Sequence, residues 1–200
     1  MIKNIVFDLG NVLVIFDPKS FLHDMLSNPE LEDAMYQFYF RGDLWNLYDM
    51  DLLSHDDMIQ KGIEAFPNHP KEVKNVMNNW VKYVTEIKEN TAWIDTFKQK
   101  RYSVYILSNL PKYNYEYLIQ HVPFMKQVDG ALYSFEAKKG KPDIDFFQLF
   151  LDRYPLKAEE CLFIDDKEEN TAAASSLGFQ IIHLDNPDRL KDEISTMLCI

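Results

Sequence analysis

The sequence predicts an α/β protein with a doubly wound parallel sheet and a helical insertion close to its N-terminus. Short apolar runs that suit buried strands alternate with helical patterns from residue 93 onward, and a similar run opens the chain. The stretch from 17 to 85 shows helical patterns only. A chain of 200 residues with 46% hydrophobic content can form one core domain and still carry a small accessory module.

The expected strands are short and rich in β-branched and aromatic residues, as is typical of strands buried on both faces. They cover residues 2–7, 103–107, 161–164 and 179–184. Helices are expected between and after them, over residues 93–100, 112–121, 143–153, 168–177 and 187–198. Because strands alternate with helices, the strands are expected to lie parallel, with helices on both faces of the sheet.

The insertion is expected to contain several helices. Ser54-His55-Asp56-Asp57 resembles a capping box that opens a helix running to about Phe66, and Pro70 suits the first turn of another. In that second helix, apolar residues recur every three or four positions up to Val84 and form one face. Short linkers are expected near 15–18 and 84–88. We therefore predict a discontinuous core domain, 1–16 and 86–200, and a helical cap domain, 17–85.

The charge balance bears on the partners of this protein. With 32 acidic and 21 basic side chains, the formal net charge is −11, so the overall field repels a phosphate-rich polymer and argues against a nucleic acid partner. The same field disfavours small anions, so a site for an anionic ligand needs local cations, such as a metal ion or a buried lysine.

Targeting and redox signals are weak. The apolar N-terminus is interrupted by Asp8 and has no small-residue cleavage site, so it indicates a buried strand and not a signal peptide. No apolar stretch reaches the roughly 18 residues that a membrane span needs. Cys161 and Cys199 have no partner at metal-ligand or redox spacing, which favours reduced thiols in a cytoplasmic protein.

Polar clusters follow the expected strands, at the edge where ligands bind in an open α/β sheet. A single polar residue after a strand is expected, because every strand has to end at a polar position. Four such clusters together favour a functional site. They are Asp8, Ser108-Asn109, Lys141-Pro142, and Asp165-Asp166 with Glu169 and Asn170 one turn later.

These residue types suit phosphoryl transfer. Several carboxylates favour a hard cation such as Mg²⁺, which uses one or two carboxylates together with phosphate oxygens. Lysine supplies a compact positive charge, serine can hydrogen-bond phosphate oxygens, and a carboxylate can attack phosphorus in line. Charge neutralisation and positioning would then provide most of the catalysis.

Four segments resemble the four motifs of the haloacid dehalogenase (HAD) superfamily, in that family's order and spacing. They are FDLGNV at 7–12, LSN at 107–109, KGKPDIDFF at 139–147 and FIDDKEENTAAASSLGF at 163–179. The resemblance covers nearly the whole chain and implies a Rossmann-like core with a helical cap of the family's C1 type. Receiver domains of response regulators combine similar residues, but their acidic pair comes first, so the order argues against them.

The resemblance implies a role for each catalytic position. Asp8 would be the nucleophile that becomes an aspartyl-phosphate. Ser108 would hold a phosphate oxygen, with Asn109 contributing to the same shell of contacts. Lys141 would bridge Asp8 and the phosphate and screen their repulsion.

The resemblance also implies a magnesium site. Asp8 and the carbonyl oxygen of Gly10 would be ligands of Mg²⁺, together with Asp166, whereas Asp165 matches the position that acts through a metal-bound water. Glu169 stands where many relatives have Asp and is expected to orient a water molecule or Lys141.

Some neighbouring residues are weaker candidates for a role in the active site. Lys138 and Lys139 could compete for the role of Lys141, but only Lys141 precedes the proline of the motif. Asn11 could be a functional amide, although Gly-Asn is also an ordinary turn pair, which we favour. Glu168 fits a solvated helix start.

The sequence departs from the family pattern at Gly10. Most phosphatases of the superfamily have a second Asp there, which protonates the leaving alcohol and then activates water, and such help is typically worth roughly 10² to 10⁴ in rate. A slower or more selective phosphatase could use a metal-bound water, substrate groups or another side chain such as Asp17. A branch that resembles bacterial glucose-1-phosphate phosphatases also carries DLGNV, and an anomeric leaving oxygen needs less protonation.

Two other hypotheses for the function remain open. One is a protein that binds phosphorylated ligands without turnover. The other is a dehalogenase that uses Asp8 on carbon, but dehalogenases need no metal and have no use for Asp165-Asp166.

Aromatic residues crowd the expected cap around Tyr36–Arg41, with Trp45, Tyr48 and Trp80 nearby. At helical spacing such residues usually form core. Some could instead close over a sugar, and Arg41 could reach a substrate hydroxyl or carboxylate. Two more tyrosines just beyond Ser108-Asn109 could contact a substrate in the same way, namely Tyr113 and Tyr115.

Taken together, the sequence predicts a Mg²⁺-dependent phosphatase whose helical cap covers the site and recognises the leaving group. The expected substrates are small phosphorylated metabolites, foremost sugar phosphates. We expect a cytoplasmic monomer or weak homodimer without a nucleic acid or membrane partner.

Overall fold

The computed structural model describes residues 1–198, and a five-stranded parallel sheet lies at its centre. The strand order is β5-β4-β1-β6-β7, so β1 pairs with β4 on one side and with β6 on the other. The strands are β1 (Asn4–Phe7), β4 (Ser103–Ser108), β5 (Gly130–Tyr133), β6 (Cys161–Asp165) and β7 (Gln180–His183). The predicted α/β class is confirmed.

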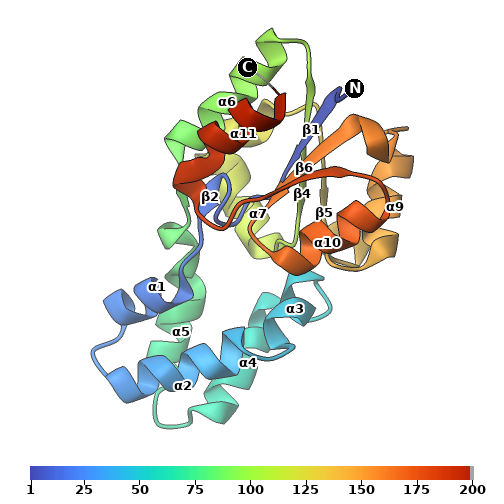
Figure 1. The fold of residues 1–200 in the computed structure, drawn as a ribbon. Helices are drawn as coiled ribbons and strands as arrows, with labels where there is room; N and C mark the ends of the chain where they lie inside the picture. The colour runs from blue at the N-terminus through green and yellow to red at the C-terminus, as the bar shows by residue number, and fades with distance from the viewer. Residues whose placement is uncertain (199–200) are drawn as a thin grey trace.

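Helices cover both faces of this sheet (Figure 1). Successive residues of β1 alternate between them, because Ile5 and Phe7 belong to one hydrophobic cluster and Val6 to the other. The first face is covered by α6 (Lys88–Gln99), α7 (Lys112–His121) and α11 (Leu190–Leu198), and the second by α9 (Ile144–Arg153) and α10 (Glu168–Ser176). Short helical turns complete the core: η2 (Pro123–Lys126), α8 (Ser134–Ala137), η3 (Ala158–Glu160) and η4 (Pro187–Arg189).

The four predicted strands are all present, with ends that differ by one or two residues from those expected. The sequence analysis missed β5. This strand lies at the edge of the sheet, where it pairs with β4 alone, and its first two residues are only partly buried. It therefore lacks the continuous apolar run by which a strand buried on both sides is recognised.

The inserted segment folds into helices between two very short strands. β2 (Val14–Ile15) pairs antiparallel with β3 (Thr85–Glu86), so the chain leaves and returns side by side. Between them lie α1 (Pro18–Met25), α2 (Pro29–Phe40), α3 (Leu44–Asp49), α4 (His55–Ala65), α5 (Pro70–Asn79) and η1 (Trp80–Tyr83). Figure 1 shows these helices beyond one end of the sheet. The division into domains at 16/17 and 85/86 stays a prediction.

Local sequence signals explain the helix starts in the cap. The Ser54 hydroxyl accepts from the Asp57 backbone N–H at 3.1 Å, and the Asp57 carboxylate accepts from the Ser54 N–H at 2.9 Å, so the predicted capping box is present. Pro70 occupies the first turn of α5, as predicted. The apolar pattern suggested that this helix would continue to Val84, but α5 ends at Asn79 and the chain tightens into the 3-10 turn η1.

Two further predictions concern membranes and thiols. Among the described residues, no helix has both the length and the apolar character that a bilayer span would require. Cys161 is a free thiol buried at the start of β6. Cys199 lies outside the described residues.

Candidate active site

The carboxyl ends of three neighbouring strands meet at one cavity. Asp8 follows β1, and Ser108 and Asp165 are the last residues of β4 and β6, the two strands that flank it. The cavity has a volume of about 480 Å³, and Asp8, Ser108 and Lys141 are among the residues that line it. The position matches the general rule that ligands of open α/β sheets bind outside the carboxyl ends of the strands.

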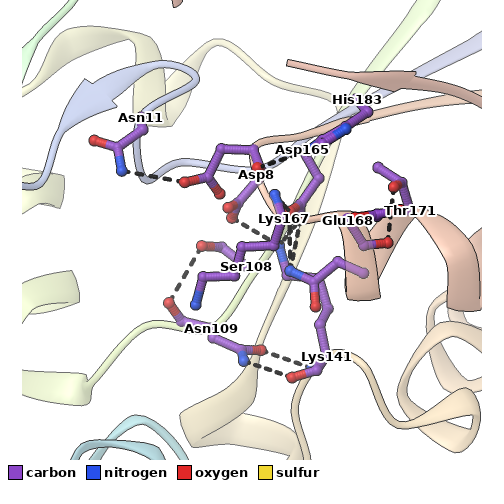
Figure 2. Close-up of polar contacts among 12 residues, drawn as sticks. Asp8, Asn11, Ser108, Asn109, Lys141, Asp165, Lys167, Glu168, Thr171 and His183 are labelled. Atoms are coloured by element: carbon purple, nitrogen blue, oxygen red, sulfur yellow. Dashed lines mark hydrogen bonds and ion pairs between the residues drawn. The ribbon is translucent and has the colours of Figure 1, made fainter. Parts of the chain in front are cut away.

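Lys141 lies at the centre of this cluster (Figure 2). Its ammonium group is 2.8 Å from Asp8 Oδ1 and 2.6 Å from Asp165 Oδ2, and its side chain is only 1% exposed. Burial alone would lower the pKa of Lys141, but Asp165 and Asp8 together raise that pKa above its usual value. Lys141 is therefore charged, and it neutralises part of the negative charge of the site.

The backbone of Lys141 is held by Asn109. The Asn109 amide donates to the Lys141 carbonyl oxygen at 2.8 Å, and its oxygen accepts from the Lys141 N–H at 2.8 Å. Gly140 makes room for this clamp, because a Cβ on Gly140 would lie 2.6 Å from Asn109 Oδ1. The Asn109 side chain is thus occupied by the protein itself, and its predicted role in substrate binding is left to its backbone.

Asp165 has no free oxygen. Its Oδ1 accepts from the Lys167 N–H at 2.9 Å and from the Asn170 amide at 2.9 Å, and its Oδ2 accepts from Lys141 and, at 3.1 Å, from Asn170. The side chain is fully buried. That Asp165 acts through a metal-bound water stays a prediction. Asn170, to which the sequence analysis assigned no role, lies one turn into α10 and orients Asp165.

Asp166 is more open and faces Asn11. The Asn11 amide donates to Asp166 Oδ2 at 3.1 Å, and its oxygen accepts from the Phe16 N–H at 3.1 Å. Asn11 has a φ of 55°, so it is the turn residue that we favoured. The structure adds that its amide also contacts the acidic pair.

The carboxylates of the site repel one another. Burial raises the pKa of Asp8 to about 6, with Lys141 opposing the rise and Asp165 and Asp166 adding to it. Burial and the neighbouring Asp165 also raise the pKa of Asp166, while the hydrogen bond from Asn11 opposes that rise. A divalent cation between these groups would relieve the repulsion.

The donor set fits a hard cation. One oxygen from each of Asp8, Asp165 and Asp166 lies within 4.8 Å of the others, and carboxylates are ligands that Mg²⁺ accepts. Because both oxygens of Asp165 already accept hydrogen bonds, Asp8 and Asp166 are the two carboxylates with an oxygen available to bind the cation. Gly10, whose carbonyl oxygen we expect as a further ligand, also lines the cavity.

Several charged residues near the motifs act elsewhere. Lys138 pairs with Asp51 and Lys139 with Asp145, so neither competes with Lys141. Glu169 lines the cavity, but among the described residues it forms no hydrogen bond or ion pair with Lys141. The next residue, Asn170, donates to Asp165 instead.

Asp17 does not fill the role left open by Gly10. Its carboxylate caps α1 by accepting from the backbone N–H groups of Lys19 and Ser20, at 3.1 and 3.2 Å. It is exposed and lies outside the residues that line the cavity. The hypothesis that Asp17 serves as acid and base is not supported, because its position is that of an ordinary helix cap.

Aromatic rings form the cap side of the cavity. The rings of Phe40 and Trp45 lie 4.3 Å apart, and those of Trp45 and Trp80 lie 5.1 Å apart. Tyr36, with Arg41 5.5 Å over its ring, also belongs to this wall. A substrate in the cavity would therefore meet flat aromatic surfaces as well as the carboxylates.

The two tyrosines after β4 do not belong to this wall. Tyr113 stacks on His55 of the cap at 3.8 Å and donates to the Asn78 carbonyl oxygen at 3.0 Å. Tyr115 packs against Tyr133 in the core. Tyr113 thus connects the core to the cap, and neither tyrosine lines the cavity.

A buried carboxyl group of the cap was not found from the sequence. Asp49, the last residue of α3, lines the cavity and is 8% exposed. Burial raises the pKa of Asp49 to about 8; Lys167 opposes this rise, Asp8 adds to it and Lys141 opposes it. Asp49 follows no strand and belongs to no motif, so only its place in the fold distinguishes it.

We predict that Asp49→Asn stabilises the protein at neutral pH and not at pH 4. Because the pKa of Asp49 is higher in the folded chain than in the unfolded one, folding takes up a proton between about pH 4 and pH 8. The wild type should therefore lose about 1.4 kcal/mol of unfolding free energy relative to the variant for each pH unit in that window. Urea unfolding at several pH values measures this, and equal slopes for both proteins would contradict it.

The fold and the cluster together define an α/β hydrolytic enzyme with an acidic, lysine-centred site under a helical cap. A model of the haloacid dehalogenase-like hydrolase family matches residues 2–178, and the chain belongs to that family.

Known proteins resemble this chain over most of its length. It is 22% identical to the D-ribitol-5-phosphate phosphatase of Bacteroides thetaiotaomicron over 99% of both chains. It is 23% identical to drimenol cyclase drtB of Aspergillus calidoustus over 98% of this chain, which spans only 37% of the length of that protein. The structure of a HAD family enzyme from B. thetaiotaomicron, in complex with magnesium and inorganic phosphate, has a TM-score of 0.72 at 20% identity and covers 91% of this chain and 93% of that one. This last likeness supports the fold.

Proposed function

We propose that this protein is a Mg²⁺-dependent phosphatase that hydrolyses small phosphomonoesters, with sugar phosphates as its main substrates. The observation that carries the proposal is the ion pair of Asp8 with the buried Lys141, close to Asp166 and in a cavity that Ser108 also lines. A nucleophilic carboxylate, a fixed cation and a metal-binding carboxylate at one point are what phosphoryl transfer requires. The D-ribitol-5-phosphate phosphatase of B. thetaiotaomicron, to which this chain is similar over 99% of its length, adds support.

The residues divide the work as follows. Lys141 holds Asp8 in place and attracts the phosphate, and the Ser108 hydroxyl donates to a phosphate oxygen. Asp8 then attacks phosphorus, the bond to the leaving oxygen breaks, and water later hydrolyses the aspartyl-phosphate. Mg²⁺ held by Asp8, Asp166 and the carbonyl oxygen of Gly10, with Asp165 in support, would neutralise the phosphate charge.

The cap wall favours sugar phosphates. Flat rings such as Trp45 and Phe40 offer stacking surfaces for the apolar face of a sugar, and Arg41 lies at the same side of the cavity. A volume of about 480 Å³ suits a small ester and not a polymer. A cytoplasmic location and a monomeric or weakly dimeric state remain part of this proposal.

The proposal is tested by measuring phosphate release from a panel of sugar, polyol and aryl phosphates. We expect turnover with Mg²⁺, loss of turnover after treatment with EDTA, and recovery when Mg²⁺ is added back. A protein that only binds phosphorylated ligands would release no phosphate from any member of the panel. A dehalogenase would release halide from 2-haloacids and keep that activity in EDTA.

A further inference from the structure

None of the core residues to which we have assigned a role protonates the leaving oxygen in the proposed reaction. Gly10 carries no side chain at the position where phosphatases of this kind are expected to have an acid, and Asp17 caps α1 outside the cavity. An alcohol leaves phosphorus slowly unless its oxygen receives a proton, so another group must supply it. The inference below rests on the proposed phosphatase function.

We propose that Asp49 of the cap is the catalytic acid and base: its carboxyl group protonates the leaving oxygen, and its carboxylate then accepts a proton from the attacking water. Asp49 lines the same cavity as Asp8 and belongs to the cap, which we expect to recognise the leaving group. Asp43 and Glu169 also line the cavity, but both are exposed, whereas Asp49 is buried.

The backbone of Asp49 is fixed to the core. Ser134, which is fully buried, donates its hydroxyl to the Asp49 carbonyl oxygen at 2.5 Å and accepts from the Leu110 N–H at 2.9 Å. Leu110 belongs to the loop that carries Ser108 and Asn109. Two residues after Asp49, Asp51 pairs with Lys138 at 2.5 Å. These contacts place the end of α3 at a set position relative to the phosphate-binding loop.

The carboxyl group of Asp49 is suited to carry a proton. Its Oδ1 is buried and has no hydrogen-bond partner among the described residues. An ionised carboxylate in such a place would be costly, because nothing in the protein compensates its charge directly. The pKa of Asp49 is raised for the same reason, namely its burial. The group thus enters the reaction protonated, and Lys167 and Lys141 stabilise the carboxylate once the proton has left.

The proton balance closes over one cycle. In the first step Asp8 forms a bond to phosphorus, the bond from phosphorus to the leaving oxygen breaks, and the proton of Asp49 passes to that oxygen. In the second step water attacks the phosphorus, a proton of that water passes to the Asp49 carboxylate, and the bond between phosphorus and Asp8 breaks. Asp49 ends the cycle protonated, as it began.

The leaving group provides the test. Asp49→Asn keeps the shape of a neutral carboxyl group but cannot give up a proton. We expect kcat/KM to fall about 10²-fold or more for ribitol 5-phosphate, an alkyl phosphate, and less than about 10-fold for p-nitrophenyl phosphate, whose leaving oxygen needs no proton. Because kcat/KM reports only steps up to departure of the leaving group, slower hydrolysis of the phospho-enzyme does not obscure the comparison.

Two further variants make the result decisive. Gly10 has room for a side chain, since the nearest atom to an added Cβ is Phe16 Cβ at 4.0 Å. Gly10→Asp combined with Asp49→Asn should therefore restore much of the alkyl phosphatase activity. Asp56→Asn, the same change at an exposed site of the cap, should leave both substrates unaffected.

The outcomes separate this inference from the proposed function. Equal losses on both substrates, or no loss on the alkyl phosphate, would overturn the role of Asp49 while leaving the phosphatase intact. If the wild type released phosphate from no member of the panel of sugar, polyol and aryl phosphates, the proposed function itself would fail, and this inference with it.

Discussion

Asp8→Asn is expected to lower phosphate release by at least about 10⁴-fold, because the variant lacks the oxygen that attacks phosphorus. An amide is a poor nucleophile. Among the described residues, the other carboxylate that pairs with Lys141 is Asp165, which is fully buried and already accepts hydrogen bonds at both oxygens. The fold should survive, since the change also removes one of three mutually repelling carboxylates. Phosphate release under saturating Mg²⁺ measures the effect, with unfolding curves to verify the fold.

A matched control is Asp17→Asn. Asp17 lies nine residues further along, caps α1 and stays outside the cavity, so its variant should keep the wild-type kcat. A second readout is the phospho-enzyme: labelled phosphate should become attached to the wild type during turnover and not to Asp8→Asn. Residual turnover near the wild-type level in Asp8→Asn would rule out the proposed nucleophile.

Lys141→Met is expected to damage both stability and activity. The change leaves Asp8 and Asp165 without the cation that lies 2.8 and 2.6 Å from them. Removing one partner from a buried ion pair typically costs about 3–5 kcal/mol of unfolding free energy, because the remaining charge stays buried and uncompensated. Urea unfolding without metal measures the loss. Phosphate release should fall at the same time, since neither Asp8 nor the phosphate is held.

A second substitution separates the two effects. In Lys141→Met combined with Asp165→Asn, the buried charges are reduced together, so much of the stability should return while activity stays lost. Lys139→Met serves as the control, because the Lys139 side chain is 44% exposed and, among the described residues, pairs with Asp145 and not with the site. Full activity in the Lys141→Met variant would exclude the role that we assign to this lysine.

The sequence predicted the fold well where elements are buried on both sides. β1, β4 and β6 are continuous apolar runs, and the capping box of Ser54 and Asp57 fixes the start of α4 through contacts between near neighbours. The edge strand β5 and the end of α5 at Asn79 were missed or misplaced. Both depend on what packs beside the segment, which local patterns do not contain.

In the site, too, some features follow from the sequence and others only from the tertiary structure. Asp8, Ser108, Lys141 and Asp166 follow motifs or strand ends, and parallel strands necessarily bring such ends to one edge, so the sequence by itself determined which residues meet there. Only the tertiary structure decided what each neighbour does. The clamp of Asn109 on Lys141 joins residues 32 positions apart in the chain.

The clearest contrast is between Asp17 and Asp49. Both are acidic residues of the inserted segment, but only Asp17, the nearer to Asp8 along the chain, was a candidate from the sequence. The folded chain turns Asp17 to solvent as a helix cap, and it buries Asp49 against the cavity through the link from Ser134 to the core. Burial, and with it the tendency of a carboxyl group to keep its proton, arises from the packing of cap on core and has no local signature in the sequence.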